Sequence, residues 1–144
     1  MKYKLYYLQI FLIILSCDGN NRYDDLIMKN DSDQRVYYYV YATYPDTLLG
    51  DISPAQSFWL NKGANNSGFD QYGILPHSSN KFTIMGKWED LFSTPKEKKC
   101  FFFFDADTLE KIPWDTIRKK YMILKRYDLS YEDLLLRNRT VTYP

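Results

Sequence analysis

The sequence has few of the residues on which most catalytic and metal sites are built. One histidine and two cysteines occur among its 144 residues, which excludes any site built on two or more histidines. Nineteen basic and eighteen acidic residues leave a formal charge of +1, whereas nucleic-acid binding requires a clear excess of Lys and Arg on one face. Phosphate-binding glycine loops, paired-cysteine metal motifs and dinucleotide fingerprints are also missing. We therefore expect neither a cofactor nor a nucleic-acid partner.

Aromatic residues are what the chain has in excess. Tyr, Phe and Trp make up 18% of the sequence, against 45% hydrophobic and 26% charged residues overall. Aromatic side chains favour β-strands and bury large areas. This composition is typical of a folded globular protein, and the length predicts about one domain.

The first 16 residues have the pattern of a secretory signal peptide. Lys2 and Lys4 form a positive start, and an apolar run from Leu8 to Leu15 follows, interrupted only by Gln9. The run is far shorter than the roughly 20 apolar residues that a membrane-spanning helix needs. A buried N-terminal strand or helix is the alternative, but neither turn residues nor an amphipathic period accompany the run.

The end of this segment resembles the bacterial lipobox: an aliphatic residue, a tolerant position, a small residue and then cysteine. Here these positions are Ile14-Leu15-Ser16-Cys17. The resemblance implies cleavage before Cys17 and attachment of lipid to its thiol. Several acyl chains on one residue would hold a protein stably on a membrane, whereas a single chain holds it marginally. Ordinary signal cleavage near Ser16, with an incidental cysteine, is the alternative.

The predicted organisation has three parts. They are a lipoprotein signal peptide at residues 1–16, a lipidated cysteine and polar tether at 17–25, and a single domain at 26–144. Because lipid would occupy Cys17, Cys100 would have no partner for an intramolecular disulfide. Cys100 opens an apolar run and is expected to be a buried, inert thiol.

The domain is predicted to be mainly β, an antiparallel β-sandwich of six or seven short strands with two short helices. The absence of a long helix between strands disfavours a parallel sheet. The first two strands are expected to form a hairpin across the turn residues 30–33. Residues 100–104 are apolar on both faces, which predicts a central strand covered on both sides. The clearest strand segments are 26–29, 35–44, 81–85, 100–104, 122–129 and 139–143.

Two short helices are predicted late in the chain. The first follows Pro113 and places Trp114, Ile117 and Tyr121 on one face. The second spans residues 131–137, behind a capping box of Ser130 and Asp133. A single helical turn is also expected at residues 88–92, with Trp88, Leu91 and Phe92 toward the core.

Six segments of the chain carry a resemblance to known proteins. They are residues 44–47, 103–108, 113–117, 124–130, 133–134 and 140–144. Together they resemble a family of small uncharacterised lipoproteins of Bacteroides-type bacteria. The resemblance implies a lipid-anchored protein of the cell envelope, with the outer membrane as the expected location. The family carries no established activity, so it implies no functional residue. Acidic residues behind the cysteine are spread out as Asp18, Asp24 and Asp25, which leaves the periplasmic and the surface-exposed placement both open.

Three tyrosines form the candidate ligand platform. Tyr37, Tyr39 and Tyr41 share one face of the predicted strand 35–44. Rings in a row could stack against sugar rings, as aromatic side chains stack against bases, and the hydroxyl groups would lie at the rim. The alternative is a face covered by the rest of the sandwich.

Two carboxylates raise an alternative function. Asp105 and Asp107 lie on one parity at a strand end and could act as the acid and base of a small envelope hydrolase of glycans. Turn formation and helix capping explain them more simply, and the Ca²⁺-loop spacing fails after Asp107. His77 lacks the motifs of a nucleophilic triad.

The sequence as a whole predicts a lipid-anchored envelope module that is more readily a non-enzymatic binding or scaffolding protein than an enzyme. A glycan and an envelope protein are equal candidates as its partner. The carboxylate-dependent hydrolase is the alternative.

Overall fold

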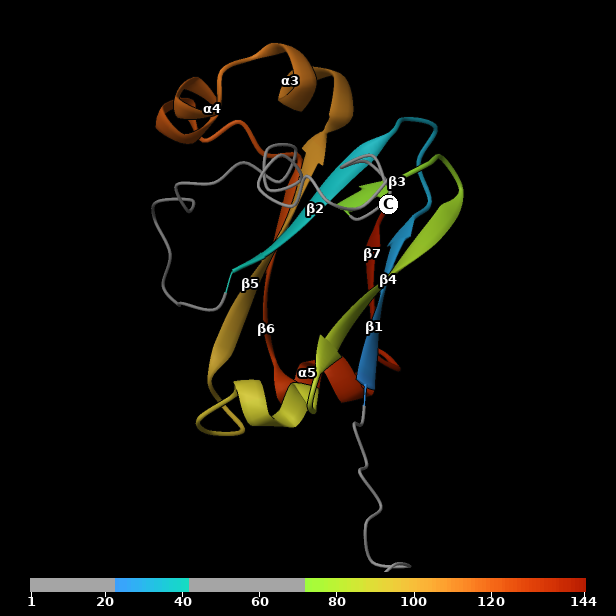
Figure 1. Cartoon of the computed structure of the whole chain (residues 1–144), viewed down its shortest axis with the longest axis vertical. Coiled ribbons are helices and arrows are strands. Elements are labelled where there is room, and N and C mark those ends of the chain that lie inside the picture. The colour runs from blue at the N-terminus through green and yellow to red at the C-terminus, as the bar shows by residue number, and fades with distance from the viewer. Residues whose placement is uncertain (1–22, 42–71) are drawn as a thin grey trace, which may run out of the picture.

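The computed structural model of the chain describes residues 23–41 and 72–144 (Figure 1). Cys17 and the predicted signal peptide 1–16 lie outside the described residues. The described part forms two β-sheets, one of three and one of four strands, with short helices around them. The predicted mainly-β fold is confirmed.

The smaller sheet has the strand order β4-β1-β7. Its strands are β1 (Tyr23–Asn30), β4 (Ser78–Met85) and β7 (Thr140–Tyr143). Strand β1 runs antiparallel to β4 but parallel to β7. The sequence had predicted an antiparallel sandwich. The pair of β1 and β7 departs from that prediction because it is parallel.

The larger sheet has the order β3-β2-β5-β6, and its neighbouring strands are all antiparallel. It consists of β2 (Val36–Tyr41), β3 (Gly73–Ile74), β5 (Lys98–Asp105) and β6 (Lys125–Ser130). Strand β5 is central and pairs with β2 on one side and β6 on the other.

The predicted hairpin between the first two strands is wrong, because β1 and β2 belong to different sheets. The side chain of Asn30, which is fully buried, organises the crossing between them. Its Oδ1 accepts from the backbone N–H of Ser32 at 3.0 Å, and its Nδ2 donates to the carbonyl of Gln34 at 2.7 Å. Nδ2 also lies 3.1 Å from the carbonyl oxygen of Leu75, which is in the connection between β3 and β4. Residues 30–33 thus form a turn, but it leads from β1 in the smaller sheet to β2 in the larger one.

The main core fills the space between the two sheets. Its aromatic members meet edge to face, with the ring of Tyr38 at 5.7 Å from Tyr72 and 5.9 Å from Phe82, a favourable geometry for ring pairs. The buried members are Leu26, Met28, Val36, Tyr38, Ile74, Trp88, Phe92, Phe101, Phe103, Leu129, Leu134 and Val141.

A second core lies on the other face of the larger sheet, beneath α3 (Ala106–Lys111) and α4 (Trp114–Lys120). The Phe104 and Trp114 rings meet there at 5.7 Å. Residues 100–104 of β5 are therefore at most 1% exposed, with alternate side chains in the two cores. The predictions of a strand covered on both sides and of a buried Cys100 are confirmed.

The helices agree with the sequence in part. The capping box of Ser130 and Asp133 is present and begins α5 (Tyr131–Leu136). Helix α3 was not predicted; it starts because the Asp105 carboxylate accepts from the N–H of Thr108 at 2.7 Å. Tyr121 does not share the buried face of α4, since it caps the helix with φ +50° and is 39% exposed.

The helical turn predicted near Trp88 is the 3₁₀ segment η2 (Trp88–Leu91). Trp88 and Phe92 are buried as expected, but Leu91 is 45% exposed. None of the helices in residues 23–41 and 72–144 is both long and apolar enough to cross a bilayer.

Truncating Phe102 and Phe103 separately tests whether both faces of β5 are core. Both side chains are 0% exposed, and removing a buried Phe ring costs about 3–5 kcal/mol. We expect Phe102→Ala and Phe103→Ala each to lower the free energy of unfolding in urea by about this amount. Leu124→Ala, at a position 38% exposed, serves as the control. A nearly silent Phe102→Ala would contradict the helical layer.

The capping box gives a second stability test. The Ser130 hydroxyl accepts from the N–H of Asp133 at 3.1 Å and its own N–H donates to the Asp133 carboxylate at 2.9 Å. Ser130→Ala should cost about 1 kcal/mol of unfolding free energy, the usual value of an N-cap. The control is Ser79→Ala on the exposed edge of β4, which should change stability by less. Equal losses in the two variants would argue against a specific cap.

Candidate functional site

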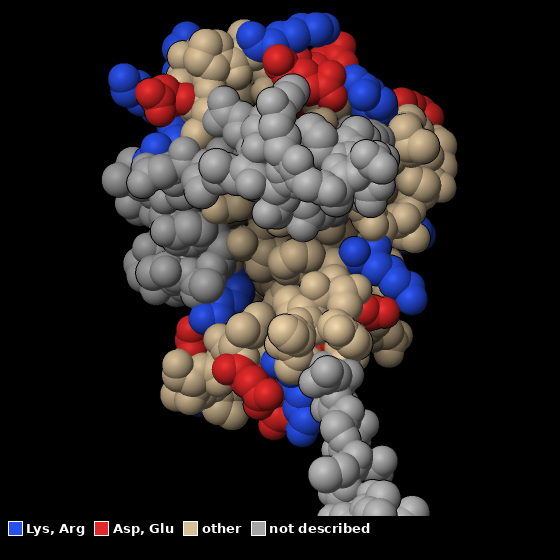
Figure 2. Space-filling model, in the orientation of Figure 1, with Lys and Arg blue, Asp and Glu red and all other residues tan. Residues whose placement is uncertain are grey.

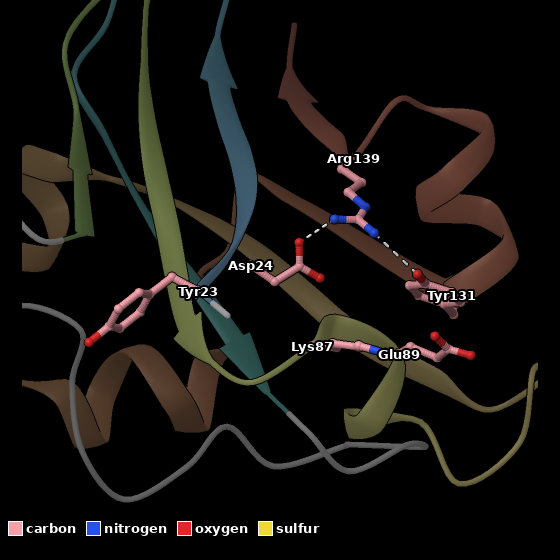
Figure 3. Close-up of a pocket in the computed structure, with 6 residues that line it drawn as sticks. All are labelled: Tyr23, Asp24, Lys87, Glu89, Tyr131 and Arg139. Atoms are coloured by element: carbon pink, nitrogen blue, oxygen red, sulfur yellow. Dashed lines mark hydrogen bonds and ion pairs between the residues drawn. The ribbon is translucent and has the colours of Figure 1, made fainter. Parts of the chain in front are cut away.

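A polar pocket lies at the end of the sandwich where β1 begins (Figure 3). Its volume is about 310 Å³. The lining comes from the start of β1, from η2 and the residue before it, and from the two ends of the segment from α5 to β7. The lining residues are Tyr23, Asp24, Lys87, Glu89, Tyr131 and Arg139.

An ion pair between Arg139 and Asp24 forms the wall of the pocket. Nη1 of Arg139 donates to Oδ1 of Asp24, and Nη2 lies 3.2 Å from the hydroxyl oxygen of Tyr131 (Figure 3). The second oxygen of Asp24 accepts from the backbone N–H of Trp88 at 3.0 Å. The two carboxylate oxygens therefore join β1 to the turn before η2 and to the segment before β7.

The backbone at Arg139 is held in a conformation that L-residues rarely adopt. Asn138 and Arg139 have φ values of +50° and +54°. These left-handed residues let the chain turn directly from α5 into β7, and the N–H of Arg139 donates to the carbonyl of Leu134 at 2.7 Å. A non-glycine residue in this region costs about 1–3 kcal/mol. The contacts of the Arg139 side chain offset part of that cost.

The electrostatic environment favours the charged form of Arg139. Burial alone would lower its pKa, but the hydrogen bond with Tyr131 and the charge of Asp24 outweigh burial and raise the pKa. The side chains of Arg139 and Asp24 are 36% and 16% exposed, so water screens the pair only in part. Arg139 is thus a fixed cation whose guanidinium positions Asp24 and Tyr131.

Two charged groups of opposite sign remain available at the mouth of the pocket. Within residues 23–41 and 72–144, neither Lys87 nor Glu89 has a side-chain hydrogen bond or ion pair, and both are exposed. Tyr23, which also lines the pocket, is 66% exposed, and its ring points away from Lys87 and Glu89 (Figure 3). A free ammonium and a free carboxylate suit the recognition of a polar group that itself carries both charges.

The predicted ligand platform looks different in the structure. Tyr37 is 4% exposed and packs in the second core. Its hydroxyl lies 3.2 Å from Oε1 of Glu110, and burial raises its pKa to about 12. Tyr39 packs against the same core, and the side chain of Tyr41 lies outside the described residues. The Tyr37 ring is therefore core packing that is closed to a ligand, which matches the alternative of a covered face.

The two carboxylates considered for a hydrolase have structural contacts. Asp105 caps α3, and Asp107 lies 2.9 Å from Nζ of Lys111 and 3.1 Å from a guanidinium nitrogen of Arg35. Hydrogen bonds with Lys111 and Arg35 lower the pKa of Asp107. Neither carboxylate lines the pocket of Figure 3. His77 forms a surface pair with Asp33 at 2.8 Å.

Comparisons with known proteins add no relative. No protein-family model matches the chain, and searches of curated proteins and of solved structures find no similar protein. In the part of the chain that the structure describes, no three His, Cys, Asp or Glu side chains come together as metal ligands.

Replacing Arg139 by glycine separates the side-chain contacts from the backbone strain. Glycine adopts a positive φ without penalty, so a residue without useful contacts would be stabilised by the change. We expect Arg139→Gly to lower the urea midpoint instead, because hydrogen bonds to charged groups contribute about 1.5–3 kcal/mol. Asn138→Gly, with the same backbone conformation, is the matched control and should be neutral or slightly stabilising. A raised midpoint for Arg139→Gly would show that the ion pair contributes little.

Proposed function

We propose that this chain is a lipoprotein of the bacterial cell envelope, anchored through Cys17, that binds or scaffolds a partner without catalysing a reaction. The observation that carries the proposal is the lipobox-like Ile14-Leu15-Ser16-Cys17 directly after a signal-like apolar run. The resemblance to Bacteroides-type lipoproteins supports the same conclusion, with the outer membrane as the expected location.

The position of the fold relative to Cys17 fits an anchored protein. Tyr23, the first residue of β1, follows Cys17 by only six positions. From Tyr23 onward the described residues belong to a body with its own cores. Stable attachment to a membrane would then come from acyl chains on the cysteine.

The polar pocket supports binding rather than catalysis. Both oxygens of Asp24 are engaged, by Arg139 and by the N–H of Trp88. The free charges of Lys87 and Glu89 have opposite signs, which favours recognition of a polar ligand or partner. A glycan and an envelope protein remain the two proposed partner classes, and no contact of Asp105 or Asp107 favours the hydrolase.

Substitution of Cys17 tests the anchor. In the native host, we expect the unchanged protein to fractionate with membranes and to carry an acylated cysteine as its first residue, as read by mass spectrometry. Cys17→Ala should release the protein from the membrane fraction or leave it as an uncleaved precursor. Treating intact cells with a protease then distinguishes a surface-exposed domain, which is digested, from a periplasmic one.

The second cysteine provides the control for this experiment. Cys100 is 0% exposed and lies in the second core, so Cys100→Ala should leave acylation and membrane fractionation unchanged. An unmodified Cys17 in the native host would refute the proposed anchoring.

A further inference from the structure

The three most exposed large hydrophobic side chains of the described residues lie at one end of the sandwich. Leu136 is 84% exposed, Met85 76% and Tyr23 66%. Tyr23 and Met85 are directly opposite each other in the pairing of β1 with β4, so they share a face of the sheet. Leu91 and Leu135, at 45% and 47%, belong to η2 and α5. These five residues are called the Tyr23 surface.

The elements that carry this surface meet at the place where β1 begins. Tyr23 of β1, Glu89 of η2 and Tyr131 of α5 line one pocket. Figure 1 shows η2 and α5 together at that end, with the helices α3 and α4 at the other. The three most exposed large hydrophobic side chains therefore belong to elements that meet at this end, whereas Leu75, which is 54% exposed, lies elsewhere.

We propose that the Tyr23 surface rests on a bilayer of zwitterionic phospholipid, with the polar pocket among the headgroups. The inference rests on the proposed anchoring through Cys17. It goes further by naming the surface that faces the membrane and the lipid chemistry that this surface meets.

The short connection to Cys17 holds this surface close to the membrane. Six residues span at most about 20 Å when fully extended, so the lipid attachment point and Tyr23 cannot be far apart. A tether of this length makes the second contact intramolecular, at an effective concentration in the millimolar range. Even a weak contact of this surface with the bilayer would then be populated.

The charges at this end fit a zwitterionic rather than an anionic membrane. Figure 2 shows acidic and basic side chains intermixed among uncharged residues at this end. An anionic membrane attracts a cluster of Lys and Arg, whereas Lys87 here stands beside Glu89 in the pocket lining. A headgroup with one phosphate and one ammonium offers a partner to both. Tyr, Leu and Met side chains suit the boundary between headgroups and acyl chains.

Spin-label accessibility in the anchored protein tests the docking. The full protein is purified from host membranes as Leu136→Cys, spin-labelled and reconstituted into vesicles of phosphatidylethanolamine and phosphatidylcholine. Cys100 is 0% exposed, and acylation would occupy Cys17, so the label goes to position 136. The relaxation of the label is measured once with oxygen, which enters the bilayer, and once with a nickel complex, which stays in water. We expect the ratio of oxygen to nickel accessibility to rise several-fold on reconstitution.

Leu75→Cys is the matched control. Leu75 is 54% exposed and lies near Ser78, which pairs with Asn30 at the far end of β1. Its ratio should not change on reconstitution. Met85→Cys repeats the test on a second element and should behave like Leu136→Cys.

The outcomes separate the two proposals, because a mass spectrum of the same preparation reports the state of Cys17. With an acylated Cys17, equal ratios at positions 75, 85 and 136 would overturn the docking and leave the anchoring intact. With an unmodified Cys17, the anchoring fails and the docking fails with it. A rise at positions 85 and 136 alone supports both.

Discussion

The burial of both faces of β5 is the constraint on which the rest of this structure depends. Residues 100–104 have no polar side chain on either face, and each is at most 1% exposed. A strand of this kind cannot lie at the surface of a two-layer sandwich, because one face would meet water. The smaller sheet therefore covers one face, and α3 and α4 cover the other. The polar pocket lies at an end of the sandwich, outside these two cores.

Local patterns in the sequence predicted the elements better than their arrangement. The strands and the capping box of Ser130 and Asp133 depend on near neighbours, so they could be predicted. The exchange of sheets at residues 30–33 could not, because the same turn residues serve a hairpin or a crossing. What decides is the burial of Asn30 and its contact with Leu75, which are properties of the whole fold. Helix α3 was missed because Asp105 ends a strand and caps a helix at the same position.

The candidate site could not be predicted from the sequence for a related reason. Asp24 and Arg139 are at opposite ends of the chain, and no spacing motif connects residues so far apart. The parallel pairing of β1 with β7 brings them together, and the left-handed backbone at Arg139 lies at the start of β7. For the tyrosine row, alternation predicted which rings share a face but not whether helices cover it. Tyr37 is buried because α3 and α4 pack there.

The pairing of β1 with β7 also affects how the chain can fold during synthesis. Strand β1 is among the first parts of the domain to be made, yet one of its two edges is completed by a strand near the other end of the sequence. Contacts between such distant segments form slowly, and an unpaired strand edge invites association with other chains. A polypeptide truncated before Thr140 would keep that edge open. The domain can therefore close only after nearly all of it has left the ribosome.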